Sequence, residues 1–513
     1  MRTEHSIKNI SIGILSQLVL VLLGFISRKI FVDSLGIEYL GINGLLTNVL
    51  AVMALVESGI GISIVYNLYK PLADGDETKI IALVQAYKKA YGFLALIVII
   101  LSVCLFPFLG VLMKDGGNIE NLGLIYFLFV SKNIVSYLNA HKWSLINADQ
   151  RGYVLAKVNL LFQVITMIAR IGILIVTNSF ILYLLIELAL YIIQTIYNGK
   201  IVNKRYPYIK TKEKYTLDIE TRVNLVKNVK AMFLHNIGGF LVFGTDNLLI
   251  ASFISVATVG LYSNYVMIIS QLSSLVNPIL EGIGASIGNL IATEQGDKNY
   301  SIFKVSFLVN FWIISLCVIF LYNVLEPFVS WWIGEQYILN HLSFIFILIN
   351  FYLTGMRTSI ATFKNKAGLF TQDKYAPVFE GMINLIISLI LVKLYGLVGI
   401  FIGTTLSTLL TIFWTQPIIV YKNVFKVSVK SYYKMYSIYL LLTVLGCLAT
   451  SSLCSLLFSG NSFLVIVGKG LICILIPNVL YFLFFYKSSE FKYICTIINR
   501  VFPKIKLQFP SAS

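Results

Sequence analysis

The residues Phe93-Leu-Ala-Leu-Ile-Val-Ile-Ile-Leu-Ser-Val-Cys-Leu105 form an apolar run in which polar and apolar side chains do not alternate. A strand of a membrane β-barrel would alternate over about 10 residues. A helix that crosses the roughly 30 Å hydrocarbon core of a bilayer needs about 20 mostly apolar residues. Outside a barrel, a backbone in lipid satisfies its own hydrogen bonds only as a helix. The run therefore predicts a membrane-spanning helix, over about residues 88–112.

The whole chain has a composition that agrees with this run. Of its 513 residues, 58% are hydrophobic and 12% are charged, and the mean hydropathy is +0.84. Soluble domains are about 45–50% apolar and about 25% charged, so the composition excludes a soluble globular enzyme. Apolar runs predict fourteen spans, at about 10–31, 40–67, 88–112, 121–141, 155–176, 179–199, 231–254, 258–291, 303–324, 338–358, 377–395, 397–420, 435–457 and 463–486. The second and eighth spans are long, so each is expected to contain a break or an extension.

The positive charge of the chain fixes the predicted topology. The chain has 40 Lys and Arg against 23 Asp and Glu, which gives a net charge of +17. With the N-terminus in the cytoplasm, 33 of the 40 basic residues fall in cytoplasmic segments, as the positive-inside rule requires. We therefore expect a multi-pass membrane protein with both termini in the cytoplasm and no nucleic-acid partner. The scattered cysteines and histidines show no metal-ligand spacing, so no metal is expected.

A repeat divides the sequence into two halves. Glu57-Ser-Gly-Ile-Gly61 resembles Glu281-Gly-Ile-Gly284, and Leu40-Gly41 matches Val259-Gly260 at a separation of 219 residues. Equivalent positions are six spans apart, so both copies run in the same direction. The sequence thus predicts an all-α polytopic membrane protein with 14 transmembrane helices, in which two six-helix bundles form a parallel pseudo-twofold repeat and a C-terminal helix pair is added.

The repeat also sets the expected domain boundaries. The N-terminal bundle covers 1–200, a basic cytoplasmic linker covers 201–230, and the C-terminal bundle covers 231–430. The additional helix pair and the cytoplasmic tail cover 431–513. In transporters of this design the substrate site lies between the bundles, near the midplane of the membrane, and access alternates as the bundles rock.

Ionisable and polar side chains inside the spans are the candidate site, because a charge in hydrocarbon is costly and usually faces a cavity or a partner. Arg28 lies either in the cavity or at the interface, where its charge would reach the headgroups. Lys132 and Arg170 either bind an anion or pair with Glu187. The candidate substrate-binding residues are Arg28, Glu57, Lys132, Arg170, Asp246, Asn247, Glu281 and Arg357.

The remaining candidates have alternative interpretations as well. Glu57 and Glu281 could pair with a neighbouring helix, and Arg357, near a cytoplasmic span end, could serve the positive-inside rule alone. Asp246 and Asn247 lie opposite Arg28 in the repeat. Glycines near the repeated motif could permit close helix packing or act as hinges, and a proline in the eighth span is expected to kink it. These packing or hinge candidates are Gly59, Gly61, Pro278, Gly282 and Gly284.

Three motifs resemble one family. They are Glu57-x-Gly-Ile-Gly61, Ala148-Asp-Gln-Arg-Gly-Tyr153 and Gly368-Leu-Phe-Thr-Gln-Asp-Lys-Tyr-Ala-Pro377. They are similar to motifs of the bacterial polysaccharide transporters, the Wzx-type flippases of the multidrug/oligosaccharidyl-lipid/polysaccharide (MOP) exporter superfamily. The related lipid II flippases carry cavity arginines in the first, second and eighth spans, whereas this chain carries Glu57 and Glu281 in the second and eighth.

The resemblance implies a function. Such proteins move undecaprenyl-pyrophosphate-linked oligosaccharides across the bacterial inner membrane by alternating access, for O-antigen, capsule or exopolysaccharide synthesis. They are not enzymes and need no cofactor. The implied partners are the lipid-linked oligosaccharide and membrane lipids; a proton or sodium ion and polysaccharide assembly proteins are further candidates, and we expect a monomer.

Two alternatives remain open at this point. A cation-coupled multidrug or small-molecule antiporter of the same superfamily would use Asp246, Glu57 or Glu281 as its ion site. A membrane oligosaccharide polymerase or ligase would need a sizeable outer loop, and the predicted topology has none. No Gly-x-x-x-x-Gly-Lys-[Ser/Thr] motif occurs, so direct use of ATP is not expected.

Overall fold

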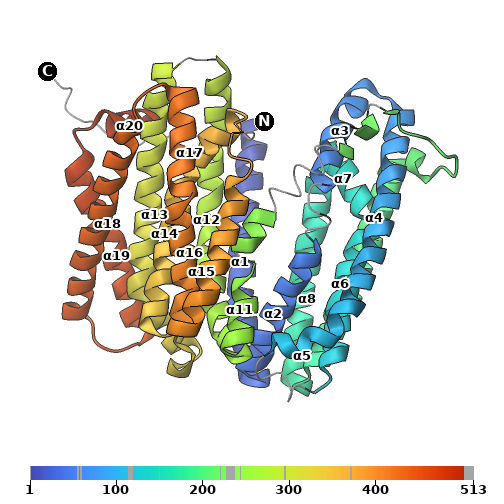
Figure 1. The fold of residues 1–513 in the computed structure, drawn as a ribbon, viewed down its shortest axis with the longest axis horizontal. Helices are drawn as coiled ribbons and strands as arrows, with labels where there is room; N and C mark the ends of the chain where they lie inside the picture. Colours follow the sequence, from blue (N-terminus) through green and yellow to red (C-terminus); the bar gives the residue numbers. More distant parts are fainter. Residues whose placement is uncertain are drawn as a thin grey trace. The chain divides into compact units, whose positions relative to one another are not determined.

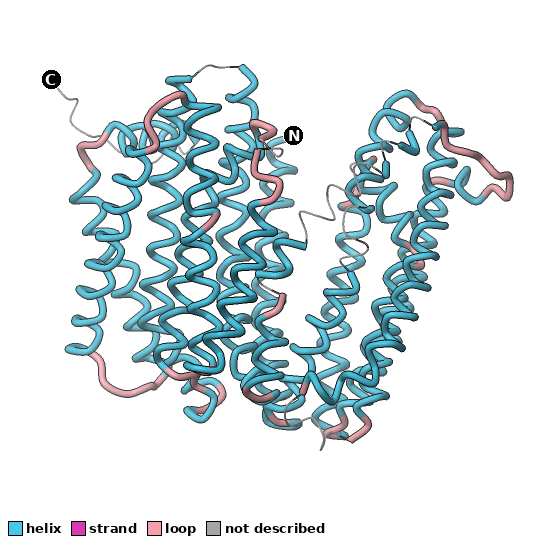
Figure 2. Tube along the Cα trace, in the orientation of Figure 1, coloured by secondary structure: helices cyan, strands magenta, loops and turns pink. Residues whose placement is uncertain are grey.

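The structure, a computed structural model, describes residues 2–54, 57, 60–113, 120–149, 151–219, 221–223, 225–226, 237–242, 244–293, 296–369 and 372–501. Every regular element in these ranges is a helix (Figure 1), which confirms the predicted all-α class, and Figure 2 shows the same ranges coloured as helices and loops. Within them, ten helices are long and apolar enough to cross a membrane, or eleven if the bent pair at 122–137 and 140–148 is one span. The count of 14 stays a prediction.

The chain divides into two compact units, Met1–Ser263 and Asn264–Ser513. The boundary lies inside helix α12 (Val256–Thr293), which begins in unit 1 and continues into unit 2. The other α-helices of unit 1 are α1 (Arg2–Leu35), α2 (Ile37–Ala54), α3 (Ile60–Asp74), α4 (Glu77–Leu105), α5 (Leu109–Leu112), α6 (Leu122–Tyr137), α7 (Ala140–Ala148), α8 (Tyr153–Thr177), α9 (Phe180–Arg205) and α11 (Asp246–Phe253). The repeat-based boundaries stay a prediction.

The long second span is interrupted, as expected. Helix α2 ends at Ala54 and α3 begins at Ile60, and Glu57 lies in a turn between them. The long eighth span is instead one extended helix of 38 residues, α12. Of the predicted packing or hinge residues, Gly59 lies outside the described residues. The surroundings of Gly61, Pro278, Glu281, Gly282 and Gly284 lie outside them as well.

Helices α2 and α12 approach each other in unit 1 through a pair of glycines. A Cβ atom added to Gly41 would lie 1.9 Å from the carbonyl oxygen of Val256, and one added to Gly260 would lie 2.3 Å from the carbonyl oxygen of Ile37. Both distances are far below a van der Waals contact, so neither position has room for a side chain. Each glycine and the carbonyl that it faces are related to the other pair by the 219 residues of the repeat. We call this contact the glycine crossing.

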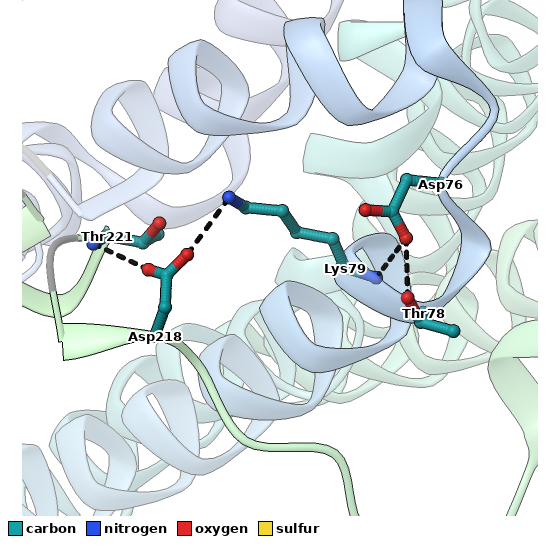
Figure 3. A network of polar contacts seen from close by, with 5 residues as sticks. All are labelled: Asp76, Thr78, Lys79, Asp218 and Thr221. Carbon is teal, nitrogen blue, oxygen red and sulfur yellow. Dashed lines mark hydrogen bonds and ion pairs between the residues drawn. The ribbon is translucent and has the colours of Figure 1, made fainter.

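A segment after α9 is fastened to the start of α4. We call it the strap: residues 206–219 and 221–223. Figure 3 shows that Lys79 Nζ lies 3.1 Å from Asp218 Oδ2. Asp218 Oδ1 accepts a hydrogen bond from the backbone N–H of Thr221 at 2.7 Å. These contacts, that with Thr221 first, lower the pKa of the Asp218 carboxyl from 3.8 to about 2.

Two further contacts hold the strap. The Gln85 side chain donates to the backbone oxygen of Glu213 at 2.7 Å and accepts from the N–H of Tyr215 at 3.1 Å. Tyr206 donates to Asp149 in the loop after α7. Asp76 caps α4 by accepting from the N–H of Lys79 (Figure 3), so the helix end that receives the strap is itself ordered.

Unit 2 is held together by aromatic side chains. Phe303, Phe307 and Phe311 recur every four residues along α13 and are fully buried. They pack against rings of α18 and α19; Phe311 stacks on Tyr439 with ring centroids 4.3 Å apart. The predicted C-terminal helix pair is thereby fixed to α13. The α-helices that follow α12 are α13 (Gly296–Trp332), α14 (His341–Lys366), α15 (Ala376–Tyr395), α16 (Leu397–Leu410), α17 (Ile412–Val420), α18 (Lys430–Leu457), α19 (Phe463–Phe485) and α20 (Ser489–Val501).

Substitution of either glycine of the crossing should destabilise the protein. Gly41→Ala and Gly260→Ala each place a methyl group against backbone, and overpacking of this kind costs about 1–3 kcal/mol. The expected result is a lower melting temperature of the purified protein in detergent. Gly172→Ala in α8 is the matched control, because its Cβ would meet open space and Ala favours a helix. Equal melting of all three variants would contradict the crossing.

Loss of the Asp218 carboxylate should release the strap. Asp218→Asn removes the charge that pairs with Lys79, so trypsin should cut faster at the strap residues Lys210, Lys212 and Lys214. Because the pKa of Asp218 is lowered on folding, the contact is present above pH 3.8 and is lost as the pH falls toward 2. The exposed Asp74→Asn is the control; the same cleavage rate in both variants would be the contrary outcome.

Candidate functional site

Unit 1 contains a cavity of about 460 Å³, a size within the range of ligand pockets. Its walls come from four helices: α2, α6, α8 and α9. The polar lining residues are Asn43, Thr47, Lys132, Asn133, Ser136, Arg170, Glu187 and Tyr191. The cavity is therefore a polar space among apolar helices, and two of the predicted site residues, Lys132 and Arg170, lie in its wall.

The charges of the cavity converge on one carboxylate. Glu187 Oε1 lies 2.5 Å from Lys132 Nζ and 3.5 Å from Arg170 Nη1. The Arg170 guanidinium also lies 4.1 Å from the centre of the Tyr183 ring, a cation–π contact that holds it in place. Of the two possibilities left open by the sequence for Lys132 and Arg170, the structure contains the pairing with Glu187.

Arg28 adds a further positive charge beside this cluster. It lies on α1, which packs against α8, and it is close enough to Arg170 for the two charges to repel. Among the described residues, nothing accepts a hydrogen bond from the buried Nη1 of Arg28 or from the buried Nε of Arg170. Three cations thus share one carboxylate, and the cluster has an excess of positive charge and unused donors.

The neutral polar wall of the cavity was missed by sequence reasoning. Asn43 and Thr47 lie one turn apart on α2, and Asn133 and Ser136 lie one turn apart on α6. Each residue alone is ordinary in a membrane helix. The signal that could have found them is the helical spacing of amide and hydroxyl groups on one face of an apolar span.

The other candidates in unit 1 lie apart from the cavity wall. Glu57 interacts with the hydroxyl groups of Tyr91 and Tyr137, whose rings stack with centroids 5.9 Å apart, so it pairs with neighbouring helices. Asp246 is buried in the first turn of α11, and Asn247 follows it. Within the described part of the chain, neither Oδ1 of Asp246 nor Oδ1 of Asn247 receives a hydrogen bond.

Arg357 lies in unit 2, in a separate polar cluster. Its Nη1 is 3.7 Å from Glu380 Oε1, and the same oxygen accepts a hydrogen bond from Thr408 at 2.9 Å. Glu380 is buried, so Arg357 acts as its counter-ion as well as a basic residue near a span end. The described residues contain no group of three or more His, Cys, Asp or Glu placed to hold a metal ion.

The pairing in unit 2 can be tested by a double substitution. Arg357→Ala leaves the buried Glu380 carboxylate without its cation, and breaking such a pair costs on the order of 3–5 kcal/mol. We expect a clear fall in melting temperature. The double variant Arg357→Ala/Glu380→Gln removes both charges and should recover most of the loss. A double variant as unstable as the single one would show that the pair does not set the stability.

Solved membrane transporters share this fold. A structure of the lipid II flippase MurJ in an inward closed conformation is 14% identical, with a TM-score of 0.67 over 92% of this chain and 98% of that chain. An inward-facing multidrug resistance transporter of the MATE family, in the MOP superfamily, is 14% identical, with a TM-score of 0.58 over 78% and 97%. The Vibrio cholerae MATE transporter VcmN is 17% identical, with a TM-score of 0.55 over 77% and 91%. These identities show the fold alone.

Sequence comparison adds the family. A Salmonella typhi protein named "Putative O-antigen transporter" is 23% identical over 429 residues, which cover 79% of this chain and 93% of that protein. The model of the family described as "Polysaccharide biosynthesis protein" matches residues 6–284, more than half of the chain. The predicted resemblance to polysaccharide transporters is confirmed, and the chain belongs to the polysaccharide biosynthesis protein family.

Proposed function

We propose that this protein is a flippase that moves undecaprenyl-pyrophosphate-linked oligosaccharides from the cytoplasmic to the outer leaflet of the bacterial inner membrane. The observation that carries the proposal is the cation-rich polar cavity of unit 1, in a chain whose family makes polysaccharides. The product would serve surface polysaccharide synthesis, as O-antigen, capsule or exopolysaccharide.

The chemistry of the cavity suits such a headgroup. A pyrophosphate is a multiply charged anion, and guanidinium and ammonium groups are its usual protein ligands. Arg170, Lys132 and Arg28 supply them, with an excess of positive charge over Glu187. Sugar hydroxyls need neutral donors and acceptors, which Asn43, Thr47, Asn133, Ser136 and Tyr191 would provide.

Transport by alternating access needs a source of energy. The unused carboxylate oxygen of the buried Asp246, next to an unused amide oxygen of Asn247, supports coupling to a proton or a sodium ion. We place both termini in the cytoplasm because the positive-inside rule is satisfied in that topology. Glu57, Glu281 and Arg357 remain candidates for contact with substrate in other states of the cycle.

A multidrug antiporter of the same superfamily is less well supported. Its cationic drugs would need an acidic or neutral aromatic cavity, whereas the cavity of unit 1 has two cations and one carboxylate in its wall. The likeness to the MATE transporters concerns the fold.

Removal of the cavity cations should slow transport without loss of protein. We expect Arg170→Gln and Arg28→Ala to reduce the leaflet exchange of a polyprenyl-pyrophosphate-linked oligosaccharide in reconstituted vesicles by tenfold or more, because charge-assisted contacts to phosphate are each worth about 1.5–3 kcal/mol. Asp246→Ala should reduce exchange too, by loss of the coupling site. The measurement is the fraction of labelled sugar that is exposed outside the vesicles.

The control for this experiment is Lys157→Ala, which removes an exposed lysine from α8, the helix that carries Arg170. It should exchange the lipid as the wild type does. Normal exchange by both arginine variants would disprove the assignment of the cavity, and exchange of a drug cation in place of the lipid would favour the antiporter.

A further inference from the structure

We infer that Glu187 is a built-in competitor of the substrate: it occupies the cationic site when the cavity is empty and sets the rate at which the anionic headgroup leaves. This inference rests on the proposed function, because it takes the headgroup to be a pyrophosphate. It assigns Glu187, which sequence reasoning treated only as a structural partner of Lys132 and Arg170, a role in release.

The first argument is the position of Glu187. It is the one acidic residue among those that line the cavity. Its Oε1 receives both Lys132 and Arg170. A phosphate oxygen in this cavity would need the same two cations, so the carboxylate and the ligand cannot both hold them fully. Glu187 therefore competes with any anion that enters.

The second argument is that the pairing is incomplete. A guanidinium binds a carboxylate best through two parallel hydrogen bonds, but Arg170 reaches Glu187 with one nitrogen at 3.5 Å. Nε of Arg170 and Nη1 of Arg28 are buried donors to which no described residue offers an acceptor. The cluster thus retains donors for a second anion that carries several oxygens.

The third argument concerns which cation moves. The side chain of Lys132 is 45% exposed, against 22% for Arg170. Arg170 is held on the Tyr183 ring, whereas Lys132 lies 5.9 Å from the Tyr191 ring and has a flexible stem. Lys132 is the side chain that can exchange Glu187 for the ligand, while Arg170 stays in place as the fixed part of the site.

The exchange gives the carboxylate a use in transport. Without Glu187, the empty cavity would contain buried cations without a counter-charge, which is costly in a membrane. With it, the empty state is stabilised and the arriving anion replaces one ion pair by another. A site that must release its ligand has to bind it weakly enough for it to leave, and a resident carboxylate that recaptures Lys132 provides that.

Glu187→Gln tests this inference, because it keeps the shape and removes the charge. The probe is inorganic pyrophosphate, titrated against the purified protein by calorimetry. We expect about tenfold tighter binding, since one charge-assisted competitor is lost, together with slower leaflet exchange of the polyprenyl-pyrophosphate-linked oligosaccharide. Glu187→Asp keeps the charge and should resemble the wild type more closely in both measurements. Glu120→Gln, an exposed acid of unit 1 away from the cavity, is the control for net charge.

The outcomes separate the inference from the proposed function. If the wild type binds pyrophosphate and exchanges the lipid, but Glu187→Gln binds pyrophosphate no more tightly, the competitor role is wrong and the flippase assignment stands. If the wild type neither binds pyrophosphate nor exchanges the lipid, both are wrong. A merely structural role would lower affinity and melting temperature together.

A second variant covers the case in which Glu187→Gln does not fold. The double variant Lys132→Met/Glu187→Gln removes one charge of each sign and leaves Arg170 without a competitor. It should bind pyrophosphate about as tightly as the wild type, because the lost cation and the lost competitor offset each other. Loss of pyrophosphate binding by the folded double variant would overturn the inference.

Discussion

A charge inside a membrane helix needs a partner, and this requirement shapes both units of the protein. In unit 1 Glu187 serves Lys132 and Arg170; in unit 2 Glu380 serves Arg357. Each carboxylate lies on a different helix from its cations, so the ion pairs join helices as well as neutralise charge. Where the pairing is complete it stabilises the fold, and where cations outnumber carboxylates, beside the cavity of unit 1, it leaves charge for a ligand.

Packing between the helices follows from the same surroundings. Lipid is as apolar as the side chains, so burial alone does not hold membrane helices together, and close contact must do so. Unit 1 has the glycine crossing between α2 and α12, and unit 2 has stacked rings between α13, α18 and α19. In the hairpin of α15 and α16, a Cβ on Gly399 would lie 2.2 Å from the carbonyl oxygen of Leu391. The glycines that mark the family motif near Gly396 are thus explained by packing.

The fold was predictable because hydrocarbon leaves the chain few choices. Apolar runs gave the helices, and quoted motifs gave the family. The partners of the charged residues were harder. The pairing of Lys132 and Arg170 with Glu187 was one of two open possibilities, since it depends on how α6, α8 and α9 rotate about their axes. Glu380 as the partner of Arg357, and the tyrosines around Glu57, depend on tertiary packing that spacing along one helix does not contain.

The glycine crossing has a consequence for the history of the chain. Gly41 faces the carbonyl of Val256, Gly260 faces the carbonyl of Ile37, and both members of each pair are 219 residues from their counterparts. A contact in which i meets j and the copy of i meets the copy of j is isologous, the form found at the twofold axis of a homodimer. In an ancestor made of two identical half-length chains, one glycine codon would have supplied both sides of the crossing. Fusion of the halves let the two glycines vary separately, yet the close approach of the backbones still holds both in place.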